Sequence, residues 1–513
     1  MDTLKRMIIS RETKIAFVST MVIGFITHMY ILTNHYPTWD DLVSYSINPD
    51  YTFFGRPLVG FFGAFSTQYS MSAVNGMLAL LFVSMAVILV VDLFEVKNSL
   101  SIILLGGIVV TFPSMASNFA YMYTADVFLF SFFLSILAIW LSSKYRFGFI
   151  PGSICIMLSL SIYQAYISSA AIIAMLVLIY NQITLKETNQ IKYILKYVST
   201  IILGFMLYKV FLDFVLEYKD ISLHTTNGVN NLDNMSFKDM LFRIPDTYKV
   251  FINALLNDSS FSQNKIKLYS VLGLLLTAVI LVIVMFVKQK QYKHIVAYLV
   301  VFGGMLVFPI LCNPAFLISN DVSYDTLLSL PYAFILCIPV IVLDVFFRNS
   351  IYEAKIIKAI KYISISALLL TIYNNYLIDN VCYFNMEMRY EKALALTTRV
   401  LDRIETTEGY YKGMPICLYE VKCPEDEIDK NTSMTDIFVD DIGGTNGDVI
   451  LCSASHYWYM MIQHLGCVTS GITAEKKASI EQTCAFQNMD VWPALSSVQI
   501  IDDVVVVKIY GNY

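Results

Sequence analysis

The chain has 513 residues, of which 57% are hydrophobic and only 15% are charged, and its formal net charge is −5. Ordinary soluble domains carry about 25% charged residues, so this balance argues against a soluble enzyme. It also argues against a nucleic-acid-binding protein, which needs a basic face or stripe. The charges fall in short clusters between long apolar runs, which is typical of a multi-pass membrane protein.

Eleven apolar runs approach the length of about 20 residues that a membrane-spanning helix needs. They lie at 15–33, 74–95, 101–116, 124–142, 148–163, 165–182, 195–217, 269–287, 294–313, 326–347 and 362–379. The first run follows a basic stretch and no small-residue cleavage site comes after it, so we predict an uncleaved span. The third and fifth runs are short, and only Tyr163-Gln164 separates the fifth run from the sixth.

The positive charges indicate which side each loop faces, because cytoplasmic loops are enriched in Lys and Arg. Lys144 and Arg146 precede the fifth run and Lys186, Lys192 and Lys196 follow the sixth. Both groups are cytoplasmic only if the chain turns back at Tyr163-Gln164, so we predict a tight hairpin there. This topology places the N-terminus in the cytoplasm. It places the loops 34–73, 117–123 and 218–268 and the tail after 380 outside.

The chain is therefore predicted to be mainly α, with a membrane domain over 1–380 and a small extracytoplasmic α/β domain over 381–513. In the tail, 386–407 has helical periodicity, 415–421 and 497–509 are typical of strands, and 453–465 is compatible with a helix. The loop 218–268 mixes polar with apolar residues, which suits an interfacial helix. The tail holds six cysteines, Cys382, Cys417, Cys423, Cys452, Cys467 and Cys484. They are compatible with disulfides outside the cytoplasm or with free core thiols.

The first outer loop contains two adjacent carboxylates, Asp40 and Asp41, followed by Arg56. An Asp side chain can take a proton from an attacking hydroxyl, and the planar Arg fork suits a phosphate. The alternative is structural, with both carboxylates capping a helix and Arg56 reaching toward lipid headgroups. The residues alone leave both interpretations open.

Two further stretches are candidate contacts for a sugar. Tyr123 and Asp126 lie at the start of the fourth run, where an acid is either functional or a helix cap. Tyr163 and Gln164 lie at the hairpin turn, where they could hydrogen-bond a sugar or simply be interfacial polar residues. The long outer loop adds weaker phosphate-binding candidates, namely Lys219, His224, Arg243 and Lys249.

The chain resembles the serotype-converting bacterial O-antigen glucosyltransferases (Gtr type II), which belong to the GT-C class of membrane glycosyltransferases. The resemblance rests on Asp40-Asp41, on Gly55-Arg56-Pro57, on Tyr123-Thr-Ala-Asp126 and on Ser161-Ile-Tyr-Gln164. Each motif is short, but their order and placement match, and the likeness extends in outline over the whole chain.

The resemblance implies that a sugar, expected to be glucose, is carried on a polyprenyl phosphate and transferred to a polysaccharide such as O-antigen at the outer face of the bacterial inner membrane. Asp40 or Asp41 would act as general base in an inverting displacement. Arg56, with help from Arg243 and Lys249, would bind the phosphate. Tyr123, Asp126, Tyr163 and Gln164 would hold the donor sugar or the acceptor. No cofactor is required, although the Asp pair would permit a divalent metal such as Mg²⁺ or Mn²⁺.

Two other functions remain open on the sequence alone. A lipid or polysaccharide transporter would show internal repeats or charges near the centres of spans, and Lys209 and Asp213 are the closest approach to this pattern. An outward-facing sensor or anchor would work through the tail and would not need the Asp and Arg residues of the first outer loop.

Overall fold

The computed structural model describes residues 10–44, 50–67, 69–185, 189–223, 237–318, 325–348, 355–422, 442 and 458–511. Contacts divide the chain into two compact units. The first comprises Met1–Asn34, Pro49–Asn380 and Asp441–Gly443, and the second His35–Asn48, Val381–Asp440 and Gly444–Tyr513. The described residues 35–44 therefore belong with residues of the tail rather than with their neighbours in sequence.

The first unit is a bundle of long helices joined by short ones. The long helices are α2 (Arg11–Thr33), α5 (Ser72–Leu93), α6 (Ser99–Val110), α8 (Met122–Lys144), α9 (Phe149–Ile162), α10 (Ile167–Ile183), α11 (Gln190–Lys219), α15 (Lys265–Lys288), α16 (Ile295–Cys312), α18 (Ala333–Arg348) and the first part of α19 (Lys355–Glu405). The connecting helices are η1 (Tyr51–Phe54), α4 (Val59–Gly63), α7 (Ser114–Ala120), η2 (Gln164–Tyr166), α12 (Phe237–Phe242), α13 (Ile244–Asn257), α14 (Ser259–Ser262), η4 (Gln291–Lys293), α17 (Ala315–Ile318), η5 (Thr326–Leu328) and η6 (Leu330–Tyr332).

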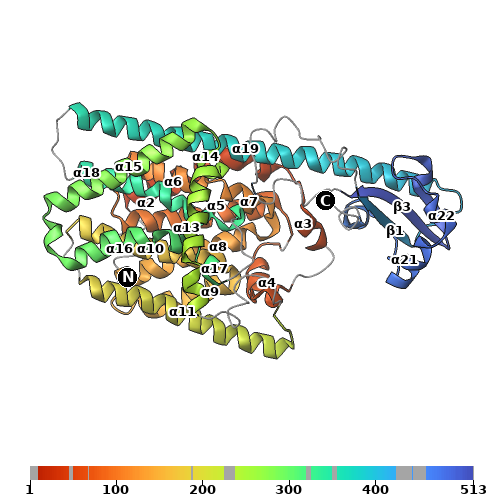
Figure 1. Cartoon of the computed structure of the whole chain (residues 1–513), viewed down its shortest axis with the longest axis horizontal. Helices are drawn as coiled ribbons and strands as arrows, with labels where there is room; N and C mark the ends of the chain where they lie inside the picture. Colours follow the sequence, from red (N-terminus) through yellow and green to blue (C-terminus); the bar gives the residue numbers. More distant parts are fainter. Residues whose placement is uncertain are drawn as a thin grey trace. The chain divides into compact units, whose positions relative to one another are not determined.

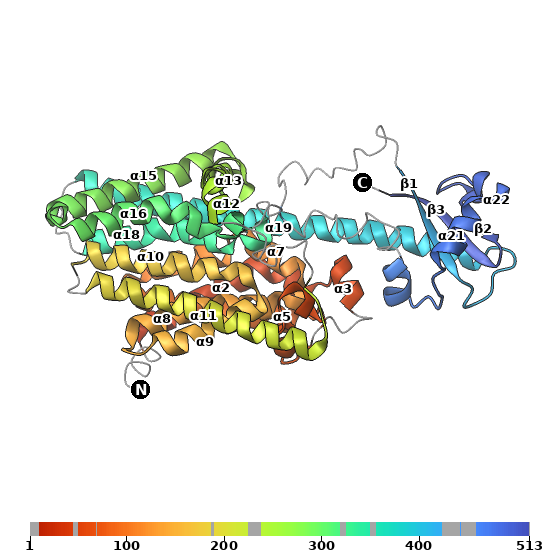
Figure 2. The ribbon, with the colours of Figure 1, turned by 60° about the horizontal axis from the view of Figure 1, so that its bottom comes forward.

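Helix α8 lies at the centre of this bundle and packs against α5, α9 and α10. Figures 1 and 2 show α8, α9 and α11 side by side, and α10 next to α16. Most side chains of α8 are buried, including the whole of Met122–Leu129. A helix that is buried on nearly all sides occupies a core position in its bundle.

Helical segments cover most of each of the eleven predicted runs. Among the described residues, eight helices are long and apolar enough to cross a membrane. The third run is the pair α6 and α7, bent by 46°, the fifth is the 14-residue α9, and the eleventh is part of the 51-residue α19. Eleven crossings and their orientation therefore stay predictions, while a set of apolar membrane-type helices is observed.

The predicted break between the fifth and sixth runs is present. Helix α9 ends at Ile162, Tyr163 is extended with φ −152° and ψ 106°, and η2 leads into α10. Tyr163 and Gln164 therefore lie at the turn between α9 and α10.

The second unit is built on a three-stranded sheet with the order β1-β3-β2. Its elements are α3 (Trp39–Ser44), α19 from Val381, β1 (Ile416–Lys422), η7 (Met460–His464), α21 (Ala474–Glu481), α22 (Cys484–Gln487), η8 (Leu495–Ser497), β2 (Val498–Ile501) and β3 (Val504–Gly511). Strand β1 runs parallel to β3, with Ile416 opposite Val505, and β2 runs antiparallel to it, with Ile500 opposite the same residue.

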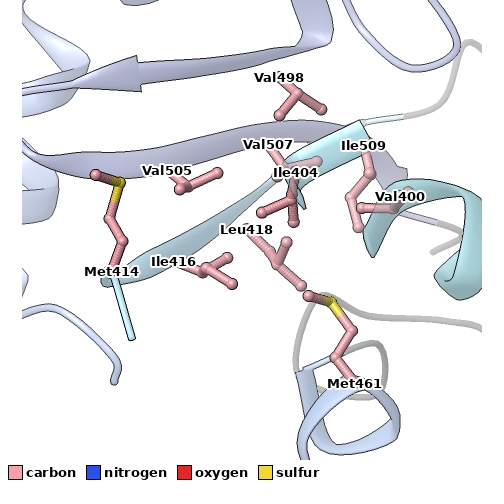
Figure 3. Close-up of a cluster of buried hydrophobic side chains, with 10 residues drawn as sticks. All are labelled: Val400, Ile404, Met414, Ile416, Leu418, Met461, Val498, Val505, Val507 and Ile509. Atoms are coloured by element: carbon pink, nitrogen blue, oxygen red, sulfur yellow. The ribbon is translucent and has the colours of Figure 1, made fainter. Parts of the chain in front are cut away.

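One face of this sheet packs on α19. Figure 3 shows Val400 and Ile404 of the helix pointing at Leu418, Val507 and Ile509 of the strands, with Met461 beside them. Alternate residues of β3 face opposite sides, so Val504 and Val506 join a second cluster with Ile480 and Met489. Burial on both faces explains why β3 begins with four consecutive valines.

The predictions for the tail agree with these elements where the structure describes them. The predicted helix at 386–407 is the end of α19, and the predicted strands are β1 and the β2–β3 hairpin. Residues 453–457 of the predicted helix at 453–465 lie outside the described residues, as do Cys423 and Cys452. Cys417, Cys467 and Cys484 are free thiols.

Candidate functional site

The site is built around the loop that carries Arg56 in the first unit. Gly55 follows η1 with φ 75°, a left-handed conformation that a glycine adopts without the strain of a Cβ. Its N–H donates to the carbonyl of Thr52, and the N–H of Arg56 donates to the carbonyl of Tyr51 at 3.1 Å. This tight turn fixes the direction in which the chain leaves η1.

The guanidinium of Arg56 lies over aromatic rings. Its Cζ is 4.7 Å from the ring centroid of Tyr163 and 5.8 Å from that of Phe128. The two rings stack on each other at 4.1 Å with an interplanar angle of 10°. Such a cation–π contact attracts the arginine and holds its plane without neutralising its charge.

Gln164 joins the Arg56 loop to the hairpin. The Nε of Arg56 donates to Oε1 of Gln164 at 3.2 Å, and Nε2 of Gln164 donates to the carbonyl of Gly55 at 2.8 Å. The amide of Gln164 is therefore occupied by protein groups. The structure brings the predicted residues Arg56, Tyr163 and Gln164 together from separate parts of the sequence.

The charge on Arg56 is not balanced by a neighbouring acid. Among the described residues no carboxylate lies within ion-pair distance of its guanidinium, and the hydrogen bond to Gln164 uses only Nε. Its two terminal nitrogens can still bind an anion in the bidentate manner usual for arginine. A half-buried, unneutralised guanidinium is the most distinctive electrostatic feature of this loop.

Lys219 is a weaker candidate because it is already paired. Its Nζ lies 2.6 Å from Oδ2 of Asp50 and 3.2 Å from Oγ1 of Thr52. Burial raises the pKa of Asp50, but the hydrogen bonds from Lys219 and Thr52 outweigh it and leave the pKa below its usual value. The charges of Lys219 and Asp50 therefore compensate each other.

The carboxylates Asp40 and Asp41 belong to α3 in the second unit and differ from each other. Asp41 is buried, and its Oδ2 accepts hydrogen bonds from the backbone N–H and from Oγ1 of Thr38, both at 2.7 Å. The N–H of Asp41 in turn donates to Oγ1 of Thr38 at 3.4 Å, which completes a reciprocal helix cap. Helix α3 packs through Leu42 on Tyr390 and Ala393 of α19.

Asp40 has no such partner. Among the described residues no hydrogen bond to its carboxylate is present, and the side chain is half-buried. Burial raises the pKa of Asp40 above its ordinary value. A carboxyl group of this kind is better suited to exchange protons near neutral pH than one fixed in a cap.

The remaining predicted residues lie in other surroundings. Asp126 is buried in α8 and accepts a hydrogen bond from Nδ2 of Asn75 at 3.3 Å, and Tyr123 is buried on the same helix. Arg243 donates to the carbonyl of Phe316 at 3.3 Å, and Lys249 pairs with Asp246 at 2.8 Å. His224 lies outside the described residues.

Two residues that interact with Gly55 or with Tyr163 had no signal in the sequence. Tyr208 of α11 donates its hydroxyl hydrogen to the carbonyl of Gly55 at 2.8 Å. Asp325, which caps η5 through the N–H of Leu327 at 2.8 Å, interacts electrostatically with Tyr163. Both come from segments far away in the chain, so only the fold reveals them. The described residues contain no group of three His, Cys, Asp or Glu that could hold a metal ion.

Comparison with known proteins gives one match. A family model described as Glucosyl transferase GtrII matches residues 29–343, which is more than half of the chain. No curated protein and no solved structure matches the chain. The matched range includes Asp40, Asp41, Arg56, Tyr163 and Gln164.

Proposed function

Because the chain belongs to the GtrII glucosyl transferase family, we propose that it moves glucose from a polyprenyl phosphate to a surface polysaccharide such as O-antigen. We place this reaction at the outer face of the bacterial inner membrane, with the N-terminus in the cytoplasm and the tail domain outside. The glycosyltransferase activity follows from the family. The donor, the acceptor and the mechanism are the proposal.

The unneutralised guanidinium of Arg56 is the observation that supports this donor. A sugar linked to a polyprenyl phosphate loses the lipid phosphate as its leaving group, and negative charge develops on the phosphate as the bond breaks. Preorganised donors aimed at such a developing charge are usually the largest single contribution to catalysis. The terminal nitrogens of Arg56 can supply them, and its plane is already fixed by Tyr163 and Gln164.

The proposed chemistry is a single inverting displacement. A hydroxyl of the acceptor sugar attacks the anomeric carbon of glucose, a new C–O bond forms, and the bond from that carbon to the phosphate oxygen breaks. The hydroxyl proton passes to a carboxylate. We assign this role to Asp40, because its carboxylate is not committed to hydrogen bonds within the described residues, whereas that of Asp41 caps α3.

The other residues predicted to contact the substrates are proposed to act in binding only. Tyr123 and Asp126 would contact the donor sugar or the acceptor, while Arg243 and Lys249 would strengthen phosphate binding. A divalent metal is compatible with the Asp40-Asp41 pair. The mechanism assigns charge stabilisation at the phosphate to Arg56.

The test is glucose transfer from polyprenyl-phosphate-glucose to an O-antigen acceptor by the purified protein. Arg56→Ala should lower kcat/KM roughly 100-fold, because it removes a charged donor from the transition state. Arg146→Ala is the matched control, since Arg146 also lies over an aromatic ring, that of Phe147 at 5.2 Å, but on the predicted cytoplasmic side. Equal activity of the two folded variants would contradict the assignment of Arg56.

A further inference from the structure

Tyr208 lies on α11, a helix most of whose side chains are exposed or only partly buried. It is one of the few buried residues of this helix, with only 2% of its surface accessible. Its hydroxyl donates to the carbonyl oxygen of Gly55 at 2.8 Å and accepts from Nε2 of Gln164 at 3.3 Å. A buried phenol normally requires a polar partner, and here the partner is the peptide group that precedes Arg56.

The carbonyl of Gly55 is held from two sides. Nε2 of Gln164 donates to the same oxygen, also at 2.8 Å, so both of its lone pairs are occupied. Gly55 has a positive φ and lacks a side chain that could anchor it by packing. The orientation of this peptide therefore depends on hydrogen bonds, and the backbone N–H of Arg56 belongs to the same peptide.

We infer that Tyr208 is a positioning residue for the anion site: by fixing the Gly55 carbonyl it directs the guanidinium of Arg56 toward the phosphate of a lipid-linked ligand. The inference rests on the proposed function of Arg56. Tyr208 does not itself bind the phosphate, because the hydrogen of its hydroxyl is donated to Gly55. Gln164 shares this role, since its amide contacts the loop and Tyr208.

The variant Tyr208→Phe removes only the hydroxyl, and Tyr197→Phe is its matched control. Tyr197 lies on the same helix, is equally buried at 2%, and its hydroxyl pairs with Oγ of Ser143 at 2.8 Å. The probe is farnesyl phosphate, a short polyprenyl phosphate, with farnesol as the same chain lacking the phosphate. Affinities of the full-length protein in detergent are measured by calorimetry.

Tyr208→Phe should weaken farnesyl phosphate binding about five- to tenfold, the size of one lost hydrogen bond. It should leave farnesol binding unchanged, and Tyr197→Phe should leave both unchanged. The KM for polyprenyl-phosphate-glucose should rise by a similar factor. Farnesyl phosphate binding as tight as in the wild type, or an equal loss in both variants, would overturn the role of Tyr208.

The binding and transfer assays separate this inference from the proposed function. Phosphate-selective binding that depends on Tyr208, without any glucose transfer by the wild type, would refute the donor reaction and leave the positioning role intact. Failure of the wild type to prefer farnesyl phosphate over farnesol would overturn both. If the wild type transfers glucose, but Tyr208→Phe binds farnesyl phosphate as tightly as the wild type and has the same KM for polyprenyl-phosphate-glucose, only the positioning role is overturned.

Discussion

At the scale of single residues, Asp40 and Asp41 show how neighbours of the same type acquire different properties. Asp41 fits a reciprocal cap with Thr38, so its carboxylate stabilises the first turn of α3. Asp40 takes no part in that cap, and burial raises its pKa. The cap supports the structural interpretation for Asp41, and we propose the catalytic one for Asp40.

The exchange of each carboxylate for an amide tests this division. Asp40→Asn should abolish the base and lower transfer about 10²- to 10⁴-fold without loss of stability. Asp41→Asn should retain transfer within a few-fold and lower the melting temperature, since a helix cap contributes about 1 kcal/mol. The two variants differ by one position and are controls for each other. The reverse pattern, with an active Asp40→Asn, would assign the base to Asp41.

The pH dependence of kcat/KM gives a second readout of Asp40. A general base works only when ionised, so activity must fall as the pH falls through its pKa. Because burial raises that pKa, the acid limb should lie above the ordinary Asp value of about 3.9 and should disappear in Asp40→Asn.

At the scale of elements, α11 carries Tyr208 and is seated on α9 by a close backbone approach at Gly204. A Cβ at Gly204 would lie 2.5 Å from Cβ of Ile156 and 2.8 Å from the carbonyl oxygen of Ser153. Tyr208 follows one helical turn later, on the same side of α11. The fit of α11 on α9 thus determines how far the Tyr208 hydroxyl reaches toward Gly55.

Gly204→Ala should therefore lower the melting temperature in detergent, because overpacking of this kind costs about 1–3 kcal/mol. Gly273→Ala on α15 is the matched control, since nothing lies within 4 Å of a Cβ placed there. Alanine is the better helix former, so this control should be neutral or stabilising. A melting temperature unchanged in Gly204→Ala would show that α9 and α11 can separate without cost.

The sequence predicted the elements better than their partners. Apolar runs and the basic residues on either side of Tyr163-Gln164 were sufficient for the long helices and for the break between α9 and α10. The parallel pairing of β1 with β3 joins segments about 90 residues apart, and no local pattern specifies it. Local motifs singled out Arg56, Tyr163 and Gln164 as candidate site residues. The contact of Tyr208 with Gly55 joins distant segments, and no local pattern predicts it.

At the scale of the whole molecule, the proposed reaction depends on sidedness, because a lipid-borne donor is needed only where nucleotide sugars are absent. The sequence predicts that the tail domain lies outside and that Lys97 lies in the cytoplasm. The fold provides a suitable reporter for each side. Cys484 in the tail is exposed, and the side chain of Lys97 is 60% exposed.

Labelling with a membrane-impermeant maleimide measures this sidedness in intact spheroplasts. A variant that retains Cys484 as its sole cysteine should react fully before lysis, because the reagent reaches the outer face. In a cysteine-free background, Lys97→Cys should react only after the membrane is opened. Both variants should react after lysis, which confirms that each thiol is accessible. Labelling of Lys97→Cys but not of Cys484 before lysis would show that the orientation is the reverse of the predicted one. The physical reason for a polyprenyl-phosphate donor would then be lost.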